Sequence, residues 1–147
     1  MRNTSKSYKW LRWIIFIVIL VGIQVNNASA QISVIVGKDV TKEISADDLK
    51  AFFSGEKFKY SDGSPVQIVD QPKRTISKDF YKKLLDMSKT KLAQRWMKLV
   101  LSGQAKAPVK CESDEEVKKA IAENSDYIGY IMTSSLDETV REVLKLE

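Results

Sequence analysis

Alternating runs of apolar and polar residues divide the chain after residue 30 into short strands and amphipathic helices. Ile32 to Val36 is a continuous apolar, β-branched run that ends at Gly37, which predicts a strand buried on both faces. Ile128 to Met132 has the same apolar character. Val140 to Leu146 instead alternates apolar and charged residues, which is typical of an edge strand with one face in water.

Apolar residues at helical spacing predict four helices between the first and last of these strands. Gly55 and Gly103 follow the last apolar positions of the first and third helices and should end them. Each helix is preceded by a hydroxyl side chain that can accept a hydrogen bond from a first-turn N–H group. The candidate N-caps are Ser45, Thr75 or Ser77, Ser88 or Thr90, and Ser113.

Two further short apolar runs lie between the helices, Val66 to Val69 and Val109 to Cys111, and both predict strands. Strands separated by helices form βα units, in which the strands run parallel and the helices cover the sheet. The pattern therefore predicts one α/β domain with a mainly parallel sheet flanked by helices.

Residues 1–30 have the organisation of a secretory signal peptide. Four basic residues precede an apolar core of eleven residues, Trp13 to Ile23, and Ala28-Ser29-Ala30 is an A-x-A cleavage site. The alternative is an uncleaved membrane anchor, but eleven residues fall short of the roughly 20 that a spanning helix needs. We therefore expect an exported product of residues 31–147, in the periplasm.

The net charge of +5 belongs largely to the signal peptide. Residues 31–147 carry 20 basic and 19 acidic side chains, so overall charge does not indicate a nucleic-acid partner. The charges are unevenly distributed: 73–110 holds eleven basic and two acidic residues, and 111–147 holds four and ten. The basic helices could face an acidic partner or an anionic surface, or could simply show lysines to water.

The residue types needed for most enzyme chemistry are missing. The chain has no histidine, which removes the commonest general base and metal ligand, and Cys111 is its only cysteine. A cysteine on a short apolar strand is expected to be structural rather than nucleophilic. No nucleophile elbow or phosphate-binding loop is present, so we expect no enzyme activity, cofactor or metal.

The stretch from Ile44 to Gln71, ISADDLKAFFSGEKFKYSDGSPVQIVDQ, resembles the short phosphate ABC transporter substrate-binding protein family. The similarity continues at Trp96, at Pro108-Val109-Lys110 and at Ile128-Gly129-Tyr130-Ile131, and so covers nearly all of residues 31–147. It implies a single periplasmic-binding-protein-like domain of type II, equivalent to half of a two-domain receptor.

In the larger receptors of this group, a strand ends in an arginine and a Ser-Gly-Thr turn that opens a helix onto the phosphate. The corresponding residues here are Gln71, Lys73, Arg74, Thr75 and Ser77, which the resemblance implies as ligand-binding residues. Gln71 stands in place of the arginine, and no Ser-Gly-Thr follows. Alternatively, the hydroxyls only cap the helix and the two basic side chains are solvated.

The resemblance implies a periplasmic solute-binding module that binds phosphate or a related oxyanion for an inner-membrane ABC permease. Because one domain supplies half a cleft, a closed site would need a homodimer or another protein. The alternative is an envelope interaction or regulatory protein that keeps the half-receptor fold without binding a solute.

Overall fold

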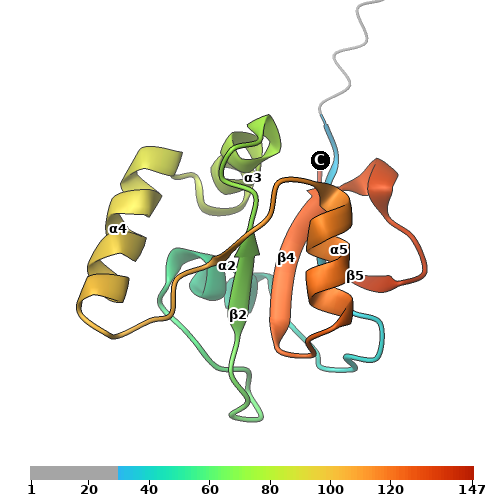
Figure 1. Cartoon of the computed structure of the whole chain (residues 1–147), viewed down its shortest axis with the longest axis horizontal. Coiled ribbons are helices and arrows are strands. Elements are labelled where there is room, and N and C mark those ends of the chain that lie inside the picture. The colour runs from blue at the N-terminus through green and yellow to red at the C-terminus, as the bar shows by residue number, and fades with distance from the viewer. Residues whose placement is uncertain (1–29) are drawn as a thin grey trace, which may run out of the picture.

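The computed structural model describes residues 30–147, which form a five-stranded sheet with helices on both faces (Figure 1). Residues 1–29, most of the predicted signal peptide, lie outside the described part. The strand order is β3-β2-β4-β1-β5. The strands are β1 (Ile32–Gly37), β2 (Gln67–Asp70), β3 (Val109–Lys110), β4 (Tyr127–Met132) and β5 (Val140–Leu146). The helices are α2 (Ala46–Ser54), α3 (Thr75–Leu85), α4 (Lys89–Leu101), α5 (Asp114–Ala122) and the short 3₁₀ helix η1 (Thr133–Ser135).

The predicted α/β class is confirmed, and the sheet is mixed because of one strand. β2 pairs in parallel with β3 and β4, whereas β1 is antiparallel to both of its neighbours, β4 and β5. Four strands therefore run in one direction and β1 runs against them. The carboxyl ends of β2, β3 and β4 consequently meet at one edge of the sheet, the position where open α/β sheets usually bind ligands.

Each face of the sheet carries its own hydrophobic core. The larger core packs Ile68 and Tyr130 against α2, α3 and α4, and the smaller one packs Val69 and Ile131 against α5. All six residues of β1 are buried, because the strand lies inside the sheet and is covered on both faces. This explains why β1 is apolar apart from Ser33, whereas the edge strand β5 carries charged residues among its apolar ones.

The ends of α2, α4 and α5 agree with the predicted capping signals. Ser45 and Asp48 form a reciprocal capping box, and Gly55 ends α2 in the left-handed conformation. The hydroxyl of Ser88 accepts from the N–H of Lys91 at the start of α4, and Ser113 does the same for α5.

The predicted cap of α3 was wrong. Neither Thr75 nor Ser77 caps this helix, which begins at Thr75 with Arg74 as N-cap and no side-chain capping bond. Thr75 lies one position and Ser77 three positions past the N-cap, and Ser77 is completely buried. The start of α3 therefore lacks the side-chain oxygen that stabilises the other three helices.

Among the described residues, none of the helices is both long and apolar enough to cross a membrane.

Candidate functional site

The carboxyl edge of the sheet brings together the end of β2, the start of α3, the start of α5 and the end of β4. The residue after β2, Gln71, is completely buried. Its amide nitrogen donates to a carboxylate oxygen of Asp114 at 3.0 Å and to the carbonyl of Tyr130 at 2.8 Å. Its amide oxygen accepts from the guanidinium of Arg74 at 2.8 Å. Gln71 thus links three elements that are distant in sequence.

Asp114 is the centre of this arrangement, and four groups donate to its carboxylate. One oxygen accepts from Arg74 at 2.6 Å and from Gln71, and the other accepts from the Ser135 hydroxyl at 2.7 Å and the Met132 N–H at 3.3 Å. The side chain is only 8% exposed. An aspartate at the start of α5 also complements the helix dipole. The edge therefore has the donors of an oxyanion site, and these donors bind a carboxylate of the chain itself.

Arg74 lies at the outer side of this cluster. Its side chain is 35% exposed, and both hydrogen bonds described above use the same terminal nitrogen, Nη1. A guanidinium group has five N–H donors in a planar fork, so an arginine held through one nitrogen can present the others to a second anion. Asp114 and Gln71 hold Arg74 in this orientation.

The structure brings only part of the predicted residue set together. Gln71 and Arg74 are in direct contact, and Thr75 is exposed at the first turn of α3 beside them. Lys73 instead pairs with Glu112 at 2.5 Å on the surface, where the carboxylate raises the pKa of Lys73. Ser77 points into the core.

Asp70 is a residue of this edge that sequence reasoning did not select. It ends β2, and its carboxylate accepts from the Tyr130 hydroxyl at 2.6 Å and from the N–H of Gln71 at 2.9 Å. Burial, followed by the charge of Asp70, raises the pKa of Tyr130. The same two causes raise the pKa of Tyr81. Only the long-range contact with Tyr130 distinguishes Asp70 from other acids, and one sequence cannot reveal that contact.

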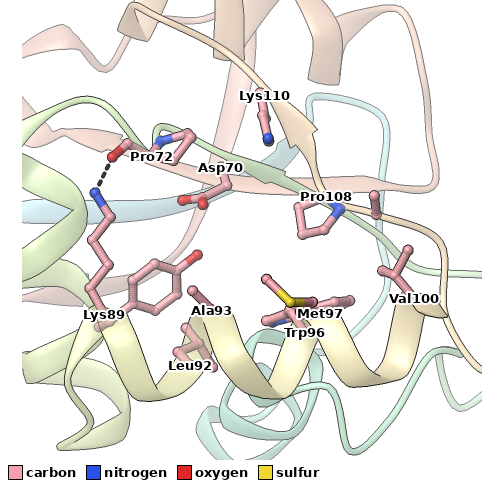
Figure 2. Close-up of a pocket in the computed structure, with 12 residues that line it drawn as sticks. Asp70, Pro72, Lys89, Leu92, Ala93, Trp96, Met97, Val100, Pro108 and Lys110 are labelled. Carbon is pink, nitrogen blue, oxygen red and sulfur yellow. Dashed lines mark hydrogen bonds between the residues drawn. The ribbon is translucent and has the colours of Figure 1, made fainter. Parts of the chain in front are cut away.

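A cavity of about 340 Å³ opens beside Asp70, between α4 and the β2–β3 edge (Figure 2). Leu92, Ala93, Trp96, Met97 and Val100 of α4 form one wall. The opposite wall contains Asp70, Pro72, Pro108 and Lys110. The ammonium group of Lys89 donates to the carbonyl of Pro72 at one end.

Two other hollows lie near the amino ends of β2 and β4, away from this edge. One, of about 320 Å³, is lined by Phe58, Gln67 and Tyr127 among others. The other, of about 580 Å³, lies between the loop after β1 and the end of α5. Of the three, the cavity beside Asp70 is the one at the carboxyl edge.

Comparison with known proteins found no matching family model and no similar curated protein. Among solved structures, similar folds occur in proteins described as a phosphate ABC transporter substrate-binding protein of Clostridium perfringens with bound phosphate, a phosphate transport receptor of Vibrio cholerae and PstS of Borrelia burgdorferi. Their TM-scores are 0.62, 0.59 and 0.58, with 16%, 13% and 14% sequence identity. Each alignment covers 78% of this chain, and it covers 45%, 46% and 47% of the three solved chains in the same order. The chain thus spans less than half the length of these structures and shares the fold of phosphate ABC transporter substrate-binding proteins.

Proposed function

We propose that the protein is an exported solute-binding module that holds phosphate or a related small oxyanion at the edge formed by Gln71, Lys73, Arg74, Thr75 and Ser77. The observation that carries the proposal is the position of Arg74. A buried carboxylate holds this arginine at the carboxyl edge of the sheet, next to a helix start without a side-chain cap. Guanidinium groups and uncapped helix N–H groups are the donors that an oxyanion needs.

In this proposal each residue has a separate role. Gln71 and Asp114 position Arg74, whose outer N–H groups bind the anion together with the hydroxyl and N–H of Thr75. Lys73 leaves Glu112 and binds the anion instead. Breaking the Lys73–Glu112 ion pair costs little free energy because both side chains are exposed. Ser77 is buried and packs beneath the first turn of α3, so it stabilises this turn and does not contact the anion.

The arrangement is half of a cleft. The similar structures are about twice as long, so the proposed site needs a second wall to exclude water. A second copy of the chain or an inner-membrane ABC permease would supply it. Delivery of the anion to such a permease from the periplasm is the transport role that this proposal implies.

Isothermal titration with phosphate, sulfate and small organic anions tests the proposal. We expect heat with at least one of these anions, and loss of that heat in Arg74→Gln. The matched control is Arg95→Gln. Arg95 lies on α4, outside the proposed residue set, and its ion pair with Glu56 is exposed. Titrations without heat for all anions would refute the proposal.

A second candidate is an envelope interaction protein, favoured by the outer surface of α4. Met97 and Leu101 are 61% and 81% exposed, and their i, i+4 spacing places both on one side of α4. The test is capture of one defined partner from envelope extracts by the protein but not by the Met97→Ser, Leu101→Ser double variant. Equal capture by both proteins would exclude this surface.

A further inference from the structure

The cavity beside Asp70 has a different chemistry from the proposed anion edge. Eight of its twelve lining residues are Ala, Leu, Met, Pro, Trp or Val, and Tyr81 adds an aromatic ring. Only Asp70, Lys89 and Lys110 are charged. A volume of about 340 Å³ is within the range of roughly 300–1,000 Å³ that is usual for small-molecule sites.

The carboxylate of Asp70 faces this apolar space (Figure 2). Both hydrogen bonds that the structure places on the carboxylate, from the Tyr130 hydroxyl and the Gln71 N–H, end on Oδ1. Oδ2 accepts neither of these two bonds, and a ligand there would share the carboxylate with the Tyr81 hydroxyl, which lines the cavity and interacts with Asp70. The ion pairs found within residues 30–147 do not include Asp70.

The two lysines of the lining lie at its rim. The ammonium of Lys89 donates one hydrogen bond to the carbonyl of Pro72, and Lys110 is an exposed residue at the end of β3. A carboxylate among apolar side chains is costly unless a positive charge compensates it. The same surroundings strengthen its attraction for a cation and its repulsion of an anion.

We infer that this cavity is a second binding site, for a small organic ammonium ion with an apolar body. The ammonium group donates to Oδ2 of Asp70, and the apolar body lies along α4 between Ala93, Trp96 and Met97. Tyr81 and Trp96 also line the cavity, and aromatic rings attract cations. The site does not include Arg74, so the inference does not depend on the proposed phosphate site.

Two kinds of natural compound share this chemistry, simple amines and apolar amino acids. Only the amino acids also have a carboxylate, and Lys110 at the rim is the residue that would bind it. The probes are therefore 2-phenylethylamine, L-phenylalanine and, as a compound without an ammonium group, 3-phenylpropionate.

Isothermal titration of the purified protein with each probe tests the inference. We expect binding of 2-phenylethylamine, of L-phenylalanine, or of both, and none of 3-phenylpropionate. Asp70→Asn keeps an oxygen for the Tyr130 hydroxyl but removes the charge, and should weaken binding by about tenfold or more. Ala93→Phe fills the cavity from an exposed position on α4 and should abolish binding.

The matched control is Asp47→Asn, because Asp47 is an exposed aspartate on α2 outside the cavity. Thermal unfolding of each variant checks its fold, and Ala93→Phe decides the question if Asp70→Asn fails to fold. Absence of binding by the unmodified protein, equal affinity for 3-phenylpropionate, or unchanged binding in both folded variants would overturn the inference. Phosphate titration of the same samples reports on the other site independently.

Discussion

At the scale of single residues, Asp114 is held by side chains from three distant parts of the chain. The Ser113-x-x-Glu116 pattern correctly predicts a helix start, and acids in a first turn are explained by the helix dipole. Nothing in that pattern separates Asp114 from Glu115, which follows it. The separation comes from Gln71, Arg74 and Ser135, which lie 21 to 43 residues away in sequence.

Replacing Asp114 should therefore destabilise the fold. Asp114→Ala leaves Gln71 and Arg74 without their shared acceptor, and we expect a loss of about 2 to 3 kcal/mol of unfolding free energy. The partial exposure of Arg74 keeps the loss at the lower end of the range for broken buried pairs. Urea denaturation measures it, with Glu112→Ala as the control, whose exposed pair with Lys73 should matter little. Equal midpoints for the two variants would contradict this assignment.

Acid should weaken the fold through Asp137. The ammonium of Lys118 and then the hydroxyl of Thr139 lower the pKa of Asp137 from 3.8 to about 2. A carboxylate whose pKa is lower in the folded state stabilises the fold above its unfolded pKa, and this stabilisation disappears as the pH falls. Unfolding free energy, measured by urea titration, should therefore fall between about pH 4 and pH 2. Asp137→Asn should show a shallower decrease, and identical slopes would rule out this contribution.

At the scale of elements, the sequence predicts every strand and α-helix of residues 30–147 with small shifts at the ends, but not the short 3₁₀ helix η1. A strand buried on both faces is apolar along its length, whereas an edge strand also carries charged residues. This difference in the sequence correctly separates β1 from β5. The direction of β1 was not predictable in this way, because an apolar run is the same in either direction. The prediction of a cap for α3 was wrong for a related reason. Hydroxyl residues near a helix start favour a cap, but the side chain of Ser77 is buried by tertiary packing.

The contact between β4 and α5 depends on the glycine at position 129. A Cβ atom there would lie 3.0 Å from Val117, 3.1 Å from Ile121 and 3.2 Å from Val69. Gly129→Ala should therefore destabilise the fold by about 1 to 3 kcal/mol through overpacking. Thermal and urea unfolding measure the loss.

Gly37→Ala is the matched control for this substitution. A Cβ at position 37 would meet its nearest atom, a backbone oxygen of Ile121, at 3.4 Å, and neither glycine has a positive φ. The control should remain close to the unmodified protein in stability. A Gly129→Ala variant as stable as Gly37→Ala would show that α5 adjusts to the extra methyl group.

At the scale of the whole molecule, length and pattern predict one domain, and the resemblance to the phosphate ABC transporter substrate-binding family implies that it is equivalent to half of a two-domain receptor. The solved structures support this for the fold, since less than half of each of them matches this chain. The site could be predicted only in part. The edge could be located because it follows β2, whereas the carboxylate already bound there and the cavity beside it arise from tertiary contacts.

The predicted signal peptide leads to a test on the whole product. When the chain of 147 residues is expressed in a bacterium, the envelope fraction should contain a protein that begins at Gln31, as determined by intact mass. Ala28→Asp with Ala30→Asp should block cleavage and leave the full 16.7 kDa chain. Recovery of the uncleaved chain without these changes would favour the anchor instead.

The tryptophan on α4 has a practical consequence for such a product. The other two tryptophans, Trp10 and Trp13, belong to the segment that export would remove, so Trp96 would remain as a single intrinsic fluorophore. Its indole donates to the carbonyl of Phe53 and lines the cavity beside Asp70. Because Trp96 also lines the hollow beside Phe58, a shift of its emission that Ala93→Phe removes would then report occupancy of the cavity beside Asp70, without any attached dye.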